Sequence, residues 1–208
     1  MQSTTHPSGA ATAVRPTDVL YAEHRVIERV LHALAALAGG LRRGAEIDLA
    51  DARDAVDFIA NFADRCHHGK EEAELFPAME RCGLPREVGP TAVMRSEHDE
   101  GRAHVRALRG ALAAQPFDGT TFARRAGAFV LLLREHIAKE DQVLFPMAEQ
   151  MLPAAAKADL AAVFRRVDDV EIGAAERARC LDIADRLATR YGEPEQASEA
   201  SCGGCCGH

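Results

Sequence analysis

The chain has 208 residues, of which 47% are hydrophobic and 27% are charged, so it is long enough to bury a core as a single domain. Its formal net charge is −7 and no basic run stands out, which argues against a nucleic-acid partner. No apolar run approaches the length of a membrane span, and the N-terminus lacks the features of a secretory signal. We therefore expect a cytoplasmic protein without a membrane partner, in which Cys66, Cys82 and Cys180 are reduced thiols.

The chain is expected to begin with a disordered segment, residues 1–16, which is small and polar. Thr17 and Asp18 are candidate N-caps for a first helix. That helix is expected to run to about Ala38, where Gly39-Gly40 ends it.

Three longer helices should follow. The second is expected over about 48–81, with a kink at its internal Pro77, and the third from between Pro85 and Thr91 to about Ala114. The fourth begins at the cap Asp118-Gly119-Thr120 and runs to about Met151, again with an internal proline, Pro146. These predictions place one helical domain over residues 17–152.

Further helical pattern follows Pro153, over about 154–170 and 174–191, with Gly173 as the break. We interpret residues 153–191 as one or two additional helices packed on the outside of the domain. The remainder, 192–208, is polar with a cysteine-rich end, and it is expected to be a flexible tail.

Two eleven-residue stretches match each other, HHGKEEAELFP from position 67 and HIAKEDQVLFP from position 136. In each, a histidine precedes a glutamate by four residues, about one helical turn, so the two side chains share a helix face. An upstream helix carries a single histidine directly after a glutamate in both halves of the chain. This internal duplication predicts two helical hairpins and hence an all-α, antiparallel up-down four-helix bundle. The repeated residues are His24, His67, Glu71, His98, His136 and Glu140.

A second register exists in the first repeat, because His68 and Glu72 have the same spacing as His67 and Glu71. The helical neighbours decide between the two registers. Those of His67 and Glu71 are apolar, and those of His68 and Glu72 are polar, so we expect His67 and Glu71 to face the core. Substitution of His68 or Glu72 by alanine should then leave metal content nearly unchanged.

Histidines and glutamates on apolar helix faces are costly to bury unless something compensates them. One such histidine is more often a hydrogen-bonded core residue than a ligand, but six inward residues arranged as a repeat favour a metal site. Imidazole with carboxylate suits iron, manganese or zinc, and two bridging glutamates would leave two histidines for each of two ions. Six ligands do not saturate two octahedral ions, so the site is expected to be open to small molecules. Asp141 is a rival ligand that only a local bulge would turn inward.

The order H, HxxxE, H, HxxxE, together with the Glu-His pairs and the Leu-Phe-Pro endings, resembles the hemerythrin-like, or HHE cation-binding, family over about residues 17–152. The resemblance implies a four-helix bundle with two non-haem iron ions inside it, joined by an oxo or hydroxo bridge. Carried over by position, the resemblance implies the ligands His24, His67, Glu71, His98, His136 and Glu140.

One departure from the family pattern bears on function. Oxygen-carrying hemerythrins have a further histidine four residues after the one on the third helix, where this chain has Arg102; His104 lies on another face. The departure favours redox reaction with oxygen, peroxide or nitric oxide in a stress response over reversible oxygen carriage. Whether that reaction is catalytic is left open. Tyr21, one turn before His24, is a candidate for a further ligand, although simple core packing is the favoured interpretation.

The chain ends in a dense cluster of soft ligands, SCGGCCGH. The cluster suits a thiophilic ion or a dithiol–disulfide couple, and the alternative is an exposed tail whose thiols merely oxidise. Hemerythrin-like proteins that repair iron–sulfur clusters also carry a cysteine pair, but in an N-terminal domain. The alternative function is therefore iron storage, sensing or donation, with a redox or iron–sulfur protein as partner. The tail residues are Cys202, Cys205, Cys206 and His208.

Overall fold

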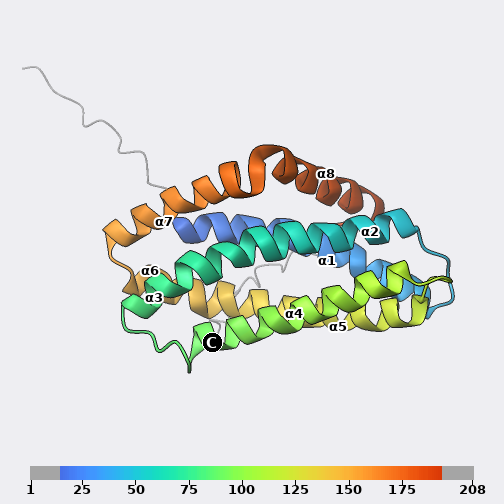
Figure 1. Ribbon diagram of the computed structural model, residues 1–208, viewed down its shortest axis with the longest axis horizontal. Helices are drawn as coiled ribbons and strands as arrows, with labels where there is room; N and C mark the ends of the chain where they lie inside the picture. Colours follow the sequence, from blue (N-terminus) through green and yellow to red (C-terminus); the bar gives the residue numbers. More distant parts are fainter. Residues whose placement is uncertain (1–14, 194–208) are drawn as a thin grey trace, which may run out of the picture.

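The structure is a computed structural model that describes residues 15–193, and within this range every regular element is helical. The candidate tail ligands Cys202, Cys205, Cys206 and His208, like residues 1–14, lie outside the described residues. The elements form an elongated bundle of antiparallel rods, with a further helical layer along one side (Figure 1). The predicted all-α bundle is confirmed.

The first hairpin joins α1 (Pro16–Arg42) to a second rod in which α-helical and π-helical geometry alternate. This alternation matters because a π-helical turn admits an extra residue and so changes which side chains face the core. The parts of the second rod are α2 (Leu49–Phe58), η1 (Ile59–His68), η2 (Glu71–Leu75) and α3 (Phe76–Arg81), of which η1 and η2 are π-helical.

The second hairpin repeats this plan with a shorter π-helical part. Its first rod is α4 (Pro90–Ala113), which packs along the following helix. Its second rod consists of α5 (Gly119–Lys139), the π-helical segment η3 (Glu140–Leu144) and α6 (Phe145–Met151). As predicted, the Asp118 side chain caps this rod by accepting a hydrogen bond from the Thr121 amide at 2.9 Å.

The C-terminal layer consists of α7 (Ala154–Arg166), the π-helical η4 (Val167–Gly173) and α8 (Ala174–Tyr191). It lies along α1 and α2 (Figure 1), with α8 packed against both helices. Gly173 marks the predicted break, with φ at +85°. Ion pairs from the arginines of α8 reach acidic residues of α2, among them Arg186 to Asp51 at 2.6 Å and Arg190 to the same carboxylate at 2.7 Å.

The ends of α1 differ from the prediction. The helix begins at Pro16 with Arg15 as N-cap, so Thr17 and Asp18 lie in its first turn. At the other end it passes through both glycines to Arg42 and stops at Gly44, whose φ is +78°. The amides of residues 44 and 45 donate to the carbonyls of residues 41 and 40, the bond pattern of a Schellman motif. A glycine ends a helix where its φ is positive, and the pair at 39–40 keeps helical geometry.

The prolines of the two Leu-Phe-Pro endings do not lie within an α-helix and kink it, as was expected. Pro77 and Pro146 each lie in the first turn of a new α-helical segment, directly after the π-helical turns η2 and η3. Because proline lacks an amide donor and clashes with the preceding turn, the wider turn before it relieves the conflict without ending the rod.

The bundle core consists of two apolar clusters with the repeated histidines between them. Leu20 belongs to the cluster around α3 and α6, whereas Ile27 belongs to the larger cluster that fills the other end of the bundle. His24 lies between these two residues on the same face of α1. The polar centre is therefore covered by apolar side chains from both ends, which keeps water away from it.

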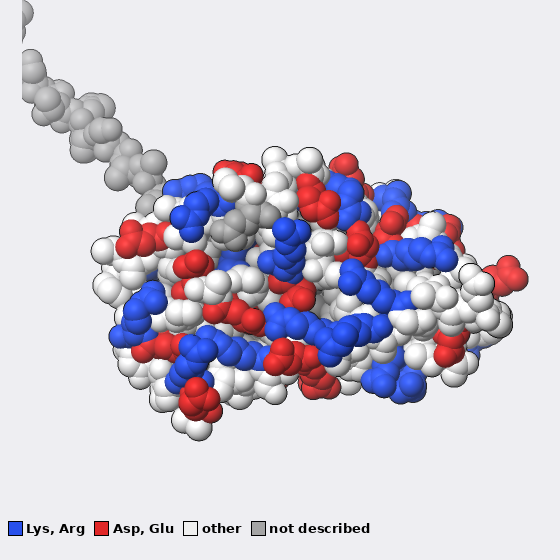
Figure 2. All heavy atoms as spheres, in the orientation of Figure 1, with Lys and Arg blue, Asp and Glu red and all other residues white. Residues whose placement is uncertain are grey.

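The outer surface carries charges of both signs. On the face shown in Figure 2, lysine and arginine alternate with aspartate and glutamate over most of the bundle. Among the described residues, no helix is both long enough and apolar enough to pass through a membrane.

Candidate metal centre

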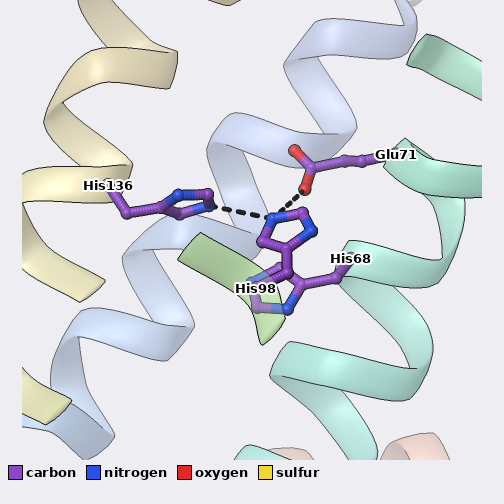
Figure 3. A group of neighbouring side chains, drawn as sticks. All are labelled: His68, Glu71, His98 and His136. Carbon is purple, nitrogen blue, oxygen red and sulfur yellow. Dashed lines mark hydrogen bonds and ion pairs between the residues drawn. The ribbon is translucent and has the colours of Figure 1, made fainter. Parts of the chain in front are cut away.

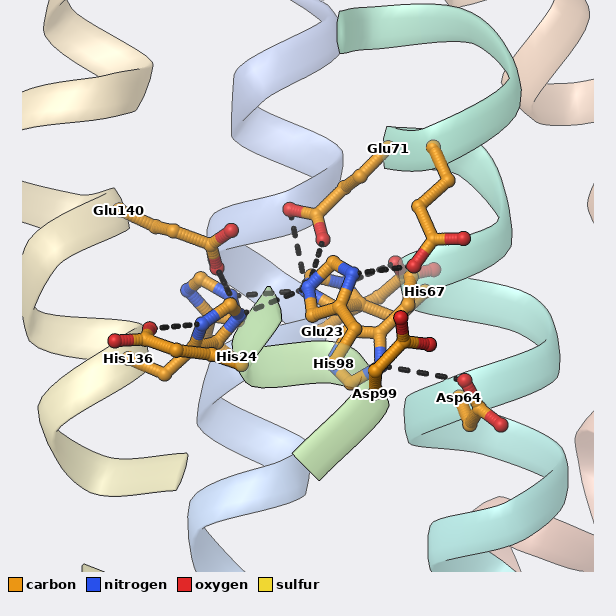
Figure 4. Close-up of polar contacts among 12 residues, drawn as sticks. Glu23, His24, Asp64, His67, Glu71, His98, Asp99, His136 and Glu140 are labelled. Atoms are coloured by element: carbon orange, nitrogen blue, oxygen red, sulfur yellow. Dashed lines mark hydrogen bonds and ion pairs between the residues drawn. The ribbon is translucent and has the colours of Figure 1, made fainter. Parts of the chain in front are cut away.

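The structure brings all six repeated residues together in the middle of the bundle (Figure 4). Each rod supplies one of the four histidines, and the two HxxxE rods also supply the glutamates. Every one of these side chains is at most 1% exposed, although all are polar. The residues are His24, His67, Glu71, His98, His136 and Glu140.

The histidines meet in two pairs through their Nε2 atoms. The Nε2 atoms of His24 and His67 are 2.9 Å apart, and those of His98 and His136 are 3.1 Å apart. Each pair joins a rod with a single histidine to a rod with HxxxE. The pairing thus follows the internal repeat of the sequence.

Each of the four rings turns its other nitrogen, Nδ1, toward a carboxylate. A carboxylate accepts a hydrogen bond, so this contact favours the proton on Nδ1 and leaves a lone pair on Nε2. Two of these partners precede the single histidines, and the other two follow the ligand glutamates of the repeats. The contacts are His24 with Asp141 at 2.6 Å, His67 with Glu23 at 3.1 Å, His98 with Glu72 at 2.6 Å and His136 with Glu97 at 3.0 Å.

Two facing lone pairs 2.9–3.1 Å apart suit a shared cation. Two nitrogens that each bind one metal at about 2.1 Å and at right angles are about 3 Å apart, which is close to the observed separations. Without a cation, one proton must sit between the nitrogens of each pair. The paired imidazoles therefore fit a metal site better than a set of structural hydrogen bonds.

The two glutamates lie between the histidine pairs. Glu140 approaches His24 Nε2 at 3.2 Å and His136 Nε2 at 3.3 Å. Glu71 approaches His67 Nε2 at 3.6 Å and His98 Nε2 at 3.5 Å. Each carboxylate thus touches one histidine of each pair, the position of a ligand that bridges two ions.

The oxygens of these glutamates provide the test of whether a metal fits. All four carboxylate oxygens of Glu71 and Glu140 are buried and lack a hydrogen-bond partner. An ionised carboxylate in that state is strongly unfavourable unless a cation compensates it. Two cations between the histidine pairs would satisfy all four oxygens, so the donor set fits a pair of metal ions.

The metal-free centre is electrostatically strained. Burial and the neighbouring carboxylate of Glu140 raise the pKa of Glu71 well above its usual value. Burial lowers the pKa of His67 and of His98, which keeps their rings neutral and able to bind a metal. Burial also acts on His24, but its hydrogen bond to Asp141 and the nearby negative charge of Glu140 outweigh that effect and raise its pKa to about 9.

Two lysines pair with carboxylates that contact the histidines, one in each half of the repeat. Lys70 pairs with Glu23, the partner of His67, and Lys139 pairs with Glu97, the partner of His136. Lys70 is completely buried and also contacts Asp168 of η4 at 2.5 Å. Sequence reasoning assigned no role to Glu23, Glu97, Lys70 or Lys139, and it considered Asp141 only as a rival metal ligand. The signal was available, because Lys70 and Lys139 align in the two matched stretches, as do Glu72 and Asp141.

The prediction that His68 faces away from the core is wrong. His68 is 5% exposed and its ring stacks on His98, with centroids 3.8 Å apart (Figure 3). The reason is η1, whose π-helical geometry turns two consecutive residues, His67 and His68, into the bundle. An α-helical wheel admits only one of them. The ligand atoms of His68, Glu71, His98 and His136 all lie within 4.8 Å of one another.

Glu72 was predicted to lie outside the inward pair, and it is only half-buried, but it takes part in the contacts around the centre. Its carboxylate accepts from His98 Nδ1 and from Arg102, which lies 2.8 Å away. Asp141 is likewise a partner of an Nδ1 atom: the π-helical turn at η3 exists, but it directs the side chain to the outer side of His24. Tyr21 donates its hydroxyl hydrogen to the Asp141 carbonyl oxygen at 2.9 Å and packs edge-on against Phe145.

The position of the missing family histidine is occupied by a charged network. Arg102 pairs with Asp64 at 2.9 Å as well as with Glu72. His104 is buried, but it lies against Phe129 and Glu100, away from the other histidines. Neither residue supplies a nitrogen to the groups of clustered metal-binding atoms found among the described residues.

The three described cysteines are free, as predicted. Cys66 lies near Glu23 and Asp168, a third group of clustered ligand atoms. The buried ammonium group of Lys70 already pairs with both carboxylates, so this group needs no further cation. Burial and the neighbouring carboxylates raise the pKa of the Cys66 thiol to about 12.

A family model described as the hemerythrin HHE cation-binding domain matches residues 15–148. The chain belongs to this family. Relatives with the same level of similarity are the uncharacterized proteins Mb2018 of Mycobacterium bovis and Rv1995 of Mycobacterium tuberculosis. Each is 29% identical over 191 residues, which cover 88% of this chain and 71% of the relative. No solved structure matches the chain.

The family match agrees with the geometry: the chain is a metal-binding hemerythrin-family protein with clustered histidines and glutamates able to hold cations. The match ends at residue 148, before α7 begins. The C-terminal layer is thus an addition to the family domain, although its Asp168 reaches Lys70 beside the metal centre.

Proposed function

We propose that the protein is a non-haem di-iron protein that binds or reacts with a small molecule, namely oxygen, peroxide or nitric oxide, in a redox or stress response. His24 and His67 hold one iron and His98 and His136 hold the other, while Glu71 and Glu140 bridge them. The observation that carries this proposal is the pair of buried glutamates, each lying between the two histidine pairs with no other partner for its oxygens.

The donor set favours iron over the other common metals. Magnesium and calcium prefer oxygen ligands, whereas imidazole mixed with carboxylate suits iron, manganese or zinc. Bridging carboxylates inside a four-helix bundle are typical of di-iron proteins. When bound, two iron ions would supply one-electron redox chemistry.

The surroundings favour reaction with a small molecule. Apolar clusters close both ends of the centre, and the charged residues around it are engaged in ion pairs with one another. The two cavities found among the described residues, each of about 410 Å³, are lined by residues of α2, of the C-terminal part of α4 and of the loop that follows it, and by none of the six ligands. A diatomic molecule or peroxide is the size of reactant that such a site admits.

The test is elemental analysis of anaerobically purified protein, with absorption spectra before and after exposure to air and to nitric oxide. We expect about two irons per chain, as the two histidine pairs imply, and a new charge-transfer band on oxidation. A single zinc ion, or no metal, with a featureless spectrum would remove the di-iron proposal and leave only the bundle.

A second candidate function is iron storage, sensing or donation to an iron–sulfur protein. It is favoured by the sequence of the tail, where three cysteines and a histidine, Cys202, Cys205, Cys206 and His208, lie within seven residues. Thiolates bind iron, zinc or copper(I), and a cysteine pair on the same chain as a di-iron centre is suited to exchange metal or electrons with it. In this alternative the bundle holds iron and the tail passes it on.

A further inference from the structure

One buried histidine remains outside the two pairs. A ring nitrogen of His68 lies within 4.8 Å of ligand atoms of Glu71, His98 and His136. Its Nδ1 makes no hydrogen bond, and its contact with Oδ1 of Asp64 is a long one, at 3.5 Å. A buried ring nitrogen without a hydrogen bond is unfavourable, so the position requires an explanation.

We propose that His68 is a seventh protein ligand, and that it binds the metal ion held by His98 and His136. The inference rests on the proposed metal centre and deepens it. His68 enters the centre from η1 beside His98, in the view of Figure 3, and it belongs to the same group of ligand atoms as both histidines and the bridging Glu71.

The internal repeat shows that packing alone does not require a histidine here. The residue that aligns with His68 in the second repeat is Ile137, which is 3% exposed. An aliphatic side chain therefore fills the equivalent position in the same bundle. The first repeat instead has a polar ring, together with a π-helical segment over 59–68 that α5 lacks. Wide turns of this kind occur frequently at functional sites because they re-aim side chains.

The proposal makes the two metal positions unequal. One ion has three histidines, His68, His98 and His136, in addition to the bridging glutamates, whereas the other has only His24 and His67. The ion with two histidines keeps more free coordination positions. Binding of a small molecule is therefore directed to the side of the centre that lies between α1 and η1.

The decisive variant is His68→Phe, because it preserves a ring that can stack on His98 and removes both nitrogens. The matched control is His104→Phe, a second buried histidine that lies against Phe129 outside the centre. Both proteins, and the wild type, are loaded anaerobically with iron enriched in the Mössbauer isotope. The measurements are iron per chain, competition against a chelator, and the Mössbauer spectrum.

We expect two iron environments in the wild type and in the control variant His104→Phe. In His68→Phe, one iron should bind as tightly as before and the other at least about 10-fold more weakly, because that ion has lost a ligand. A His68→Ala variant tests the same point with a cavity: added imidazole should restore the second iron and its spectrum.

Two results would overturn the proposal in different ways. If His68→Phe binds both irons with wild-type affinity and an unchanged spectrum, His68 is not a ligand, although the di-iron centre stands. If the wild type itself binds no iron pair, both the centre and the role of His68 are wrong. If His68→Phe does not fold, the test rests on His68→Ala. A folded His68→Ala protein in which added imidazole does not restore the second iron also overturns the assignment.

Discussion

The bridging role of Glu71 and Glu140 is a claim about single residues. Each of their carboxylates is fully buried and touches histidines of both pairs. Substitution of either residue by alanine should reduce iron content from about two per chain to one or none, because the shared ligand is lost. Iron analysis after anaerobic loading measures this. Glu135→Ala, at an exposed position next to His136, is the matched control, and a Glu71→Ala protein with two irons would show that the bridge is misassigned.

The burial of Glu71 also predicts that its substitution stabilises the metal-free protein, although the same substitution removes an iron ligand. Glu71 has no hydrogen-bond partner for either oxygen, so an apolar residue of similar size should relieve an unfavourable charge. We expect metal-free Glu71→Leu to unfold at a higher urea concentration than metal-free wild type, by about 1–3 kcal/mol in unfolding free energy. Equal or lower stability of the variant would show that the carboxylate is compensated without metal.

Cysteine reactivity follows from burial. Cys66 is fully buried and the pKa of its thiol is raised to about 12, and burial raises that of Cys180 to about 11. At pH 8 only on the order of 10⁻⁴ of Cys66 is thiolate, the reactive form. Iodoacetamide should therefore modify the exposed Cys82 and leave both buried thiols intact, as read by peptide mass mapping. Urea-unfolded protein serves as the control in which all three react, and rapid native modification of Cys66 would contradict its burial.

Sequence reasoning at the residue scale predicted which side chains come together where the repeat supplied two copies of the same evidence. The six ligand candidates were found because each aligned with a counterpart, and the structure places all six within one centre. It failed for His68, whose counterpart is Ile137. A helical wheel assumes 3.6 residues per turn, so it cannot place two adjacent residues on the inner face, and only the π-helical geometry of η1 does so.

At the scale of elements, the ends of helices were predicted less well than their existence. The stop of α1 was assigned to Gly39-Gly40, but the chain turns at Gly44, where the Schellman bonds form. Composition alone does not distinguish a glycine that permits close packing from one that adopts a positive φ. Kinks were expected at the prolines, but the structure shows a change from π-helical to α-helical geometry there. The wider π-helical turn accommodates each proline while the rod stays straight between its neighbours.

The added C-terminal layer makes an element-scale prediction. Asp168 of η4 pairs with the buried Lys70, which in turn pairs with Glu23, the partner of His67. Asp168→Ala should lower the unfolding free energy by about 1–3 kcal/mol, because it leaves a buried charge with one partner fewer. It should also weaken iron binding, since Glu23 and His67 lose part of their support.

Urea unfolding and chelator competition measure these two effects of Asp168→Ala. The control is Asp169→Ala, an adjacent carboxylate that is exposed. Equal behaviour of the two variants would mean that the C-terminal layer does not influence the metal centre. A larger loss of unfolding free energy and of iron affinity in the Asp168 variant would show that a segment outside the matched family domain influences the metal centre.

At the scale of the whole molecule, the duplication predicted the architecture, and the structure adds how the two halves cooperate. The outer partner of His24 comes from the second half of the chain, Asp141, and that of His98 comes from the first half, Glu72. Each bridging glutamate likewise contacts a histidine of the other half. Neither hairpin contains a complete centre, so metal binding and association of the two hairpins should be thermodynamically linked.

The role of the tail is also a question about the whole molecule, because its ligands belong to a separate part of the chain. All the proposed iron ligands, His68 included, lie between residues 24 and 140, so deletion of residues 199–208 should leave iron content and the absorption spectrum unchanged. The two candidate functions differ in whether the tail transfers iron to another protein. We expect the rate of reaction with oxygen or peroxide to be retained in the truncated protein if the bundle alone performs the chemistry.

The companion measurement is iron transfer from the loaded protein to an apo iron–sulfur protein, with full-length Cys202→Ser/Cys205→Ser/Cys206→Ser as the matched control for chain length. Because thiolates, and not the glycine backbone, would carry the metal, truncation and triple substitution should act alike. Loss of transfer in both, with unchanged redox turnover, would favour iron handling. Unchanged transfer in both would leave the di-iron centre as the functional part of the chain.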